Sequence, residues 1–148
     1  MTWHPFVTVA AVIRDGDRYL VVEENPDGAP VLNQPAGHLE AEESLVEAVQ
    51  REVMEETARH FTPSGLVGVY QWCVPKTDRS YLRFCFSGDV GARLPGKTTD
   101  PDIQATHWLT REQIASGERQ PRSPLVLRCI DDARRTTPLD LDYLHALF

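Results

Sequence analysis

The chain has 148 residues, 41% of them hydrophobic, and a formal net charge of −7 at pH 7. This size and composition predict a single domain over residues 1–148 with a buried core, and the negative charge excludes a nucleic-acid backbone as the expected partner, because proteins that bind one present a basic face. No run of about 18 apolar residues could span a membrane, and the N-terminus lacks the basic start of a signal peptide, so we expect a cytoplasmic protein without a membrane partner.

The first segments in chain order predict a β-hairpin followed by a long loop. Residues 6–13 and 19–24 are rich in β-branched and other apolar side chains, and an Asp-Gly turn lies between them. This pattern is typical of two antiparallel strands joined by a tight turn. Residues 25–44 are rich in proline and glycine, which favours a loop with a short strand within residues 30–35.

A helix is predicted from residue 45 to about residue 58. Ser44 is a candidate N-cap, and Glu47 follows three residues later, which is the spacing of a capping box. Apolar side chains then recur at helical spacing, at Leu45, Val46, Val49 and Val53. We therefore expect this helix to bury one of its faces.

The second half of the chain predicts another hairpin and then mainly helices. Residues 66–74 and 81–90 are β-rich and are separated by a turn-like segment. The remaining predicted elements are a strand over residues 103–109, a short helix over 110–116 with a Thr/Gln capping box, a helix over 124–134 behind Ser123 as N-cap, and a short helix within 138–148. Strands around one long helix, with helices late in the chain, indicate a mixed α/β (α+β) sandwich.

The long helix carries a patch of carboxylates. Glu52, Glu55 and Glu56 have i, i+3, i+4 spacing, and on a helical wheel Glu52 and Glu56 border the apolar face. Like charges at this spacing repel, and carboxylates near a core are costly unless they are compensated. Arg51 lies four residues from both Glu47 and Glu55 but points away from Glu56, so it cannot neutralise the whole patch.

Two interpretations of this patch are open from the residues alone. In the first, a solvated face is balanced by lysine or arginine from elsewhere in the fold. In the second, a hard divalent cation, Mg²⁺ or Mn²⁺, occupies the patch, because such ions take oxygen ligands and join carboxylates to substrate phosphates. The second interpretation predicts a site for a small-molecule phosphorylated substrate.

The segment from Gly37 to Glu56 reads GHLEAEESLVEAVQREVMEE, and it resembles the signature of the Nudix hydrolases, G-x5-E-x7-R-E-U-x-E-E-x-G-U, where U is a bulky aliphatic residue. The spacing agrees without insertion through Glu56. After Thr57 the chain has Ala58 and Arg59 where the signature has glycine and an aliphatic residue. A left-handed helix end at alanine costs about 1–2 kcal/mol, so we expect the helix to run on by a residue or to end differently.

The resemblance implies the Nudix fold, in which a curved mixed β-sheet is sandwiched between helices, and a hydrolase acting on phosphorus-containing acid anhydrides. It also implies the roles of the catalytic residues within the signature. The implied metal ligands are the carboxylates of Glu52, Glu55 and Glu56 and the backbone carbonyl of Gly37, and the implied supporting pair, which orients helix and loop, is Arg51 with Glu43.

Segments outside the signature, among them VTVAAVI, YLVVEE, LRF and RSPLV, occur in an order similar to that of the NudJ-type phosphatases, a Nudix subgroup. This wider resemblance, over about residues 6–126, implies hydrolysis of nucleoside tri- and diphosphates or thiamine-type pyrophosphates, with release of orthophosphate. Water would attack the terminal phosphorus, with Glu52 as the expected general base and Asp102 as the alternative.

Substrate contacts are predicted at five positions, and each position also has a structural explanation. Trp72 and Tyr81 offer rings for stacking, although either could simply pack in the core. Arg83 has the chemistry to reach a phosphate. Gln34 offers an amide to a base or phosphate, or to nearby backbone groups, and Asp102 is a candidate contact or a turn acid.

Other function classes stay open at this level. One is a Nudix-like sensor that binds a nucleotide without hydrolysis, which the complete set of signature acids argues against. Another is an isomerase of isoprenoid diphosphates, whose additional catalytic cysteine and glutamate are not identifiable in this chain. The sequence does not decide between Mg²⁺ and Mn²⁺, or between a monomer and a homodimer.

Overall fold

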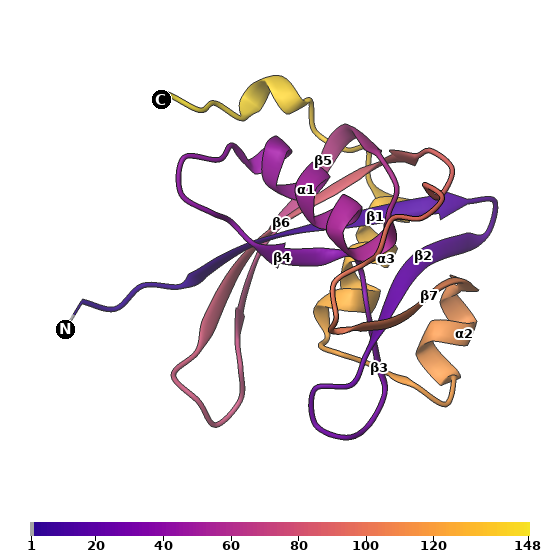
Figure 1. Cartoon of the computed structure of the whole chain (residues 1–148). Coiled ribbons are helices and arrows are strands. Elements are labelled where there is room, and N and C mark those ends of the chain that lie inside the picture. The colour runs from indigo at the N-terminus through magenta and orange to yellow at the C-terminus, as the bar shows by residue number, and fades with distance from the viewer. Residues whose placement is uncertain (1) are drawn as a thin grey trace.

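The computed structural model describes residues 2–148 and shows a curved, mixed β-sheet with helices on both faces (Figure 1). The strands of this part of the chain are β1 (Phe6–Asp15), β2 (Arg18–Glu24), β3 (Val31–Asn33), β4 (Ala36–His38), β5 (Phe61–Cys73), β6 (Ser80–Val90), β7 (Ile103–Thr110) and β8 (Gln120–Pro121). The helices are α1 (Leu45–Thr57), α2 (Arg111–Ser116), α3 (Leu125–Arg135) and the 3₁₀ turn η1 (Leu141–Tyr143). Over residues 2–148, none of these helices combines the length and hydropathy needed to cross a membrane.

Strand β1 is the centre of the sheet. The two strands of the predicted first hairpin pair with each other only next to their turn. β1 and β2 pair antiparallel at Arg14↔Tyr19 and Asp15↔Arg18. Beyond these pairs, β1 runs parallel to β6 and antiparallel to β4, whereas β2 pairs with β3 and β7. The sheet order is therefore β5-β6-β1-β2-β3-β8, with β4 beside β1 and β7 beside β2.

Alternate residues of β1 face two separate cores. Val9, Ala11 and Ile13 belong to a buried cluster that includes the apolar face of α1. Ala10 and Val12 belong to a second buried cluster, which includes residues of α2 and α3. Because a strand covered on both faces reads as a nearly continuous apolar run, this packing explains the composition of the first predicted strand. The expected sheet between helices is confirmed.

The helix starts agree with the capping signals in the sequence. Ser44 Oγ accepts a hydrogen bond from Glu47 N at 3.1 Å, and Glu47 Oε1 accepts one from Ser44 N at 3.0 Å. Thr110 and Gln113 make the same reciprocal pair at the start of α2. Helix α3 is the exception, because it begins at Leu125, one residue later than predicted, and its N-cap is Pro124 rather than Ser123, without a side-chain capping bond. Local hydrogen bonds between near neighbours thus set where α1 and α2 begin.

Some elements differ from the predicted ones. Strand β5 begins at Phe61 rather than at residue 66, because the sheet accommodates Pro63 and Gly65 at an irregularity in the pairing with β6. Strands β4 and β8 have no counterpart among the predicted elements, since segments of three and two residues are too short to show an alternating pattern. The C-terminal segment forms only the single turn η1.

The end of α1 corrects one expectation. Ala58 has φ 58° and ψ 35°, which is left-handed, so the expected extension or different ending of the helix is wrong. Contacts beyond the helix hold this conformation in place. The Ala58 carbonyl accepts a hydrogen bond from Leu94 N at 2.9 Å, while Arg59 donates to the Gly91 carbonyl at 2.8 Å and lies over the Trp108 ring. Surrounding structure that fixes a strained residue is what allows the strain to persist.

Candidate active site

Helix α1 packs the buried acids of the signature against strand β4, Glu52 at Gly37 and Glu56 at Ala36. Glu52 and Glu56 are 8% and 7% exposed, in agreement with the helical wheel, whereas the side chain of Glu55 is 39% exposed. A Cβ atom at Gly37 would lie 2.1 Å from the carboxyl carbon of Glu52, so any larger residue here would displace this carboxylate from its present position. Glu56 Oε1 accepts a hydrogen bond from Ala36 N at 2.9 Å.

Arg51 is the cation nearest to these acids. It donates to both carboxylate oxygens of Glu43, at 2.6 and 3.0 Å, and to the carbonyl of His38 at 3.0 Å. It also contacts Glu52 at 2.8 Å and Glu55 at 3.3 Å. The hydrogen bond to Glu43 is the main reason why the pKa of Arg51 is raised, and the same bond lowers the pKa of Glu43. Arg51 and Glu43 therefore tie the loop after β4 to α1.

The acids outnumber the positive charges around them. Burial, together with the charges of Glu52, Glu24 and Asp100, raises the pKa of Glu56 to about 9. Burial also raises the pKa of Glu52, although Arg51 opposes this change. Buried carboxylates are stable when protonated or when a further cation is near. The region therefore favours one more positive charge than the chain provides.

The donor set of this region fits a hard divalent cation. Three carboxylates and the backbone carbonyl of Gly37 are oxygen ligands of the kind that Mg²⁺ and Mn²⁺ prefer. Within residues 2–148, however, no three acidic, histidine or cysteine side chains are already gathered around a common point. Glu52 is turned toward Arg51, and Glu56 toward the N–H of Ala36. Binding of a cation would require these two carboxylates to turn. The fit of this region to a divalent cation is therefore inferred from the chemistry of its oxygen ligands and not from their present positions.

The loop before β7 brings Asp100, rather than Asp102, toward the glutamates. The Asp100 N–H donates to the carbonyl of Glu55 at 2.9 Å, and its charge contributes to the raised pKa values of Glu52 and Glu56. Asp102 is exposed and does not line the cavity beside the acids. The structure therefore does not place Asp102 at the site, because a backbone hydrogen bond two residues earlier fixes which acid of the loop meets α1.

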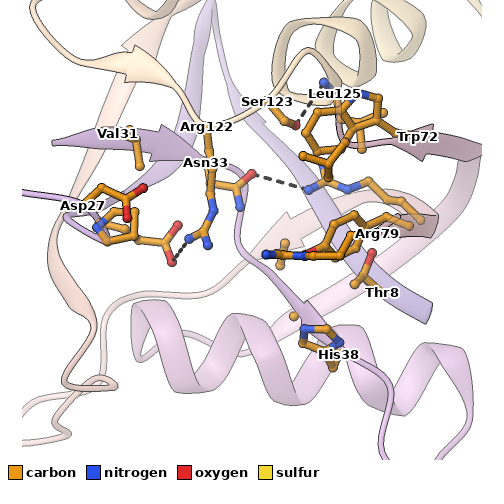
Figure 2. A pocket seen from close by; sticks show the side chains of 17 residues that line it. Thr8, Asp27, Val31, Asn33, His38, Trp72, Arg79, Arg122, Ser123 and Leu125 are labelled. Atoms are coloured by element: carbon orange, nitrogen blue, oxygen red, sulfur yellow. Dashed lines mark hydrogen bonds and ion pairs between the residues drawn. The ribbon is translucent and has the colours of Figure 1, made fainter. Parts of the chain in front are cut away.

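A cavity of about 570 Å³ lies beside Gly37, where β1 and β2 diverge (Figure 2). Its size is in the range of small-molecule sites. Its walls come from segments far apart in the chain, and their charged side chains are Glu24, Asp27, Arg79, Arg83 and Arg122. The wall thus has more arginines than acids although the whole chain has a net charge of −7. This local excess of positive charge suits an anionic ligand.

Trp72 and Tyr81 form an aromatic wall of the cavity. Their rings are stacked, with centroids 6.1 Å apart and an angle of 21° between the planes. The ring of Phe6 lies 5.6 Å from that of Tyr81, and Arg79 donates to the Tyr81 hydroxyl at 2.7 Å. Rings held in this way keep a fixed orientation, which favours stacking of a ligand ring.

Arg83 and Gln34 occupy different positions relative to the cavity. Arg83 lines it, although the residue is only 6% exposed, and donates to Gln34 Oε1 at 3.0 Å. Gln34 is 1% exposed, does not line the cavity, and donates through Nε2 to the Val126 carbonyl at 2.6 Å. Both polar groups of the Gln34 amide are used inside the protein. The structure therefore places Gln34 behind Arg83 and not at the cavity wall.

Sequence reasoning missed several charged or polar cavity residues. Arg122 contacts Glu24 Oε2 at 2.9 Å, while the other oxygen of Glu24 is buried without a hydrogen-bond partner. Asn33 accepts a long hydrogen bond, 3.5 Å, from Arg83. The pair Glu23-Glu24 at the end of an apolar strand was a usable signal, because alternation along a strand turns one of two neighbouring acids inward.

Comparisons with known proteins agree with this geometry. Residues 4–129 match the family model described as NUDIX domain. Phosphatase NudJ of Escherichia coli strain K12 is 41% identical over 141 residues, covering 93% of this chain and 90% of that protein. A NUDIX hydrolase from Nitrosomonas europaea superimposes with a TM-score of 0.92 at 44% identity, covering 97% of this chain and 98% of the other. The NUDIX domain of Shewanella oneidensis NrtR, solved with ADP ribose, has a TM-score of 0.72 at 18% identity, covering 90% and 89% of the two chains, and shows the fold alone.

Proposed function

The chain belongs to the Nudix hydrolase family, and we propose that it is a metal-dependent phosphohydrolase of nucleoside tri- and diphosphates or thiamine-type pyrophosphates. Its similarity to phosphatase NudJ supports this substrate class. The observation that carries the proposal is the burial of Glu52 against Gly37 and of Glu56 against Ala36, two residues that line a cavity with arginines and stacked rings. Nudix hydrolases generally use divalent metals, and Mg²⁺ or Mn²⁺ is the proposed cofactor.

In the proposed reaction, the signature residues have different roles. The groups that hold the cation are the carboxylates of Glu52, Glu55 and Glu56 and the carbonyl of Gly37. When bound, a divalent cation supplies positive charge to the phosphates and lowers the pKa of water. Glu52 takes the proton from the attacking water. Glu43 holds Arg51 in place, and Arg51 contacts Glu52 at 2.8 Å until that carboxylate turns toward the cation.

The cavity sets the direction in which the substrate lies. The terminal phosphate is proposed to lie beside Gly37, close to the acids of α1, and the ring of the substrate against Trp72 and Tyr81. The reason is that one part of the cavity wall adjoins the proposed cation ligands and another part is aromatic. Water then attacks the phosphorus closest to the acids, and the bond to the rest of the chain breaks. This orientation supports the release of orthophosphate and leaves the shortened phosphate chain in the cavity.

The proposal is tested by measuring phosphate release from a panel of nucleoside tri- and diphosphates and thiamine-type pyrophosphates. Orthophosphate and pyrophosphate are detected separately, with Mg²⁺, with Mn²⁺ and with EDTA. We expect orthophosphate from at least one substrate, no turnover in EDTA, and loss of turnover in Glu52→Gln. Glu47→Gln is the matched control, because it lies on the same helix and glutamine can still complete the capping box.

The contrary outcomes are distinct. Binding of a nucleotide without turnover under any metal condition would make the protein a sensor and would end the proposal. Turnover with pyrophosphate as the product would leave the hydrolase intact but reverse the proposed orientation of the substrate. Turnover that survives in EDTA would remove the cation from the mechanism.

We also propose that the enzyme acts in the cytoplasm, as a monomer or a homodimer, with its small-molecule phosphorylated substrate as sole partner. Cell fractionation tests the location. Light scattering on the purified protein measures its mass in solution, and a species larger than a dimer would contradict the proposed assembly.

A further inference from the structure

Arg83 is a buried cation for which the described chain provides no carboxylate. The residue is 6% exposed. One terminal nitrogen donates to Gln34 Oε1 at 3.0 Å and the other to Asn33 Oδ1 at 3.5 Å. Figure 2 draws the contact at Asn33. Both partners are neutral amides, and Nε is buried without a hydrogen-bond partner. Among residues 2–148, no acidic side chain lies within ion-pair distance of Arg83.

This charge cannot be removed by losing a proton. An arginine remains protonated in proteins, and a buried ion without a partner of opposite charge is unfavourable. The buried thiol of Cys129 lies next to Arg83, and its pKa is lowered, first by a hydrogen bond from Cys85 and then by the guanidinium charge. The cavity is the other place from which a compensating anion can come, because Arg83 lines it.

The position of Arg83 separates it from the acids of α1. Thr8 on β1 pairs with Arg83 on β6 and with His38 on β4. Strand β1 therefore lies between Arg83 and the strand that carries Gly37, which corresponds to two strand spacings, about 9.6 Å. Arg83 thus lines the cavity directly, whereas Glu52 and Glu56 lie on α1 against Gly37 and Ala36, two residues of β4 that also line it. Each of these two regions can bind its own part of one ligand.

Gln34 fixes the direction in which Arg83 points. The Gln34 Nε2 group donates to the Val126 carbonyl of α3 at 2.6 Å, which leaves Oε1 facing the guanidinium. A carboxylate in the same place would orient Arg83 and also neutralise it. The amide orients Arg83 and leaves its charge available to a ligand in the cavity.

We propose that Arg83, aligned by Gln34 as a positioning residue, is a subsite that binds a phosphate group of the substrate without help from a metal ion. This inference rests on the proposed function, since it takes the ligand to be a phosphorylated small molecule. It adds that the substrate is held at two anion-binding points, of which the one at Arg83 needs no cation. Arginine suits this role because its planar fork matches the oxygens of a phosphate.

The first test measures binding of pyrophosphate by calorimetry in EDTA, which removes the metal-dependent part of the site and requires no turnover. We expect the unaltered protein to bind, Arg83→Met to bind at least about tenfold more weakly, and Arg83→Lys to fall between them. Arg14→Met, an exposed arginine at the other end of β1, is the matched control. No binding by the unaltered protein, or equal binding by Arg83→Met, would overturn the subsite and would favour Cys129 as an internal counter-charge.

The second test compares thermal unfolding without ligand. If Arg83 serves a ligand, its removal relieves an unfavourable buried charge, so Arg83→Met is expected to melt at the same temperature as the unaltered protein or above it. A merely structural arginine gives the opposite result, a clear decrease in Tm. Such a decrease, with pyrophosphate binding retained, would assign Arg83 to the fold alone.

The third test keeps Arg83 and changes its partner. Gln34→Glu is expected to raise KM about tenfold with kcat within about threefold, because a carboxylate beside Arg83 cancels the charge that the phosphate needs. Gln34→Leu is expected to raise KM less, since it loses the alignment but keeps the charge. An unchanged KM in Gln34→Glu would overturn the positioning role. If the unaltered protein turns over nothing, the proposed function fails, while the calorimetric test of the subsite still stands by itself.

Discussion

Two neighbouring regions, the buried acids of α1 and the cavity wall at Arg83, have opposite deficits of charge. Around Gly37, buried glutamates have Arg51 as their nearby cation, and the pKa of Glu56 rises to about 9. Across β1, Arg83 is buried beside neutral amides without a carboxylate. The acid region lacks a cation and the arginine region lacks an anion. A phosphorylated substrate that arrives with a divalent cation completes both.

The fold prevents the two regions from neutralising each other. The acids lie on α1, and Arg83 lies on β6 at the far side of β1. If these groups met, they would form an internal ion pair and the cavity would lose its attraction for a ligand. Rigid elements that hold opposite charges apart therefore preserve binding free energy for the substrate, at the cost of stability in the empty protein.

The largest effect is expected from a substitution in the acid region. In Glu52→Gln the proposed base and one cation ligand are lost together, while the shape of the side chain is kept. We expect kcat to fall by about 10²–10⁴-fold, with little change in pyrophosphate binding at Arg83 in EDTA. Steady-state kinetics and calorimetry measure the two quantities. Retained turnover would remove Glu52 from the chemistry.

The next effect tests the space between the acids and β4. A Cβ atom in Gly37→Ala would meet the Glu52 carboxylate at 2.1–2.3 Å, so the glutamate must move. We expect kcat/KM to fall by about 10²-fold, because small displacements of catalytic groups are costly, and stability to decrease by about 1–3 kcal/mol. Gly91→Ala is the control, since a Cβ there meets nothing within 4 Å. Equal behaviour of the two variants would refute the close fit at Gly37.

A smaller effect tests the aromatic wall that lies beyond the arginine region. Trp72→Ala removes the ring that stacks on Tyr81. Loss of base stacking costs about 1–3 kcal/mol, so we expect KM for a ring-bearing substrate to rise by roughly tenfold. The binding of pyrophosphate, which has no ring, should stay the same. If both ligands weakened equally, Trp72 would be shaping the cavity and would not be contacting a ring.

The smallest expected effect is on the pH dependence of stability, to which the acid region should contribute and Arg83 should not. The pKa of Glu56 is raised from 4.5 to about 9 in the folded protein, so the folded state keeps a proton that the unfolded chain loses within that window. In EDTA the free energy of unfolding should therefore fall as the pH rises from 4.5 toward 9.

The measurement is thermal unfolding in EDTA across this window for three proteins. Glu56→Gln should show a smaller decrease of Tm with pH than the unaltered protein, because glutamine carries no proton to lose. Arg83→Met should show the same decrease as the unaltered protein. If Glu56→Gln kept the full pH dependence, the buried carboxylate would not be its source.

Local patterns predicted much of the molecule because they depend on near neighbours. The capping boxes at Ser44 and Thr110 are present, since each needs only a partner three residues away. The helical wheel correctly placed Glu52 and Glu56 at the buried face, since helical periodicity alone decides which side chains share a face. Alternation also located most strands, although not the very short β4 and β8.

Relations between distant segments were beyond the reach of such patterns. Sequence reasoning named Asp102 as the loop acid, whereas a backbone hydrogen bond to Glu55 brings Asp100 toward the glutamates. Gln34 appeared as a ligand contact until Val126 and Arg83, 92 and 49 residues away in sequence, used both of its polar groups. The left-handed end at Ala58 was excluded by local cost, yet contacts of the loop of residues 91–100 hold it.

The amino-acid sequence by itself determined the acids, their spacing and the face of the helix that carries them, because those follow from periodicity and from bonds between near neighbours. Only the tertiary structure decided that Glu52 lies against Gly37, that Arg83 is buried without a carboxylate, and that Gly37 and Arg83 line one cavity. The physical reason is that burial and charge balance depend on which distant segments the folded sheet brings together.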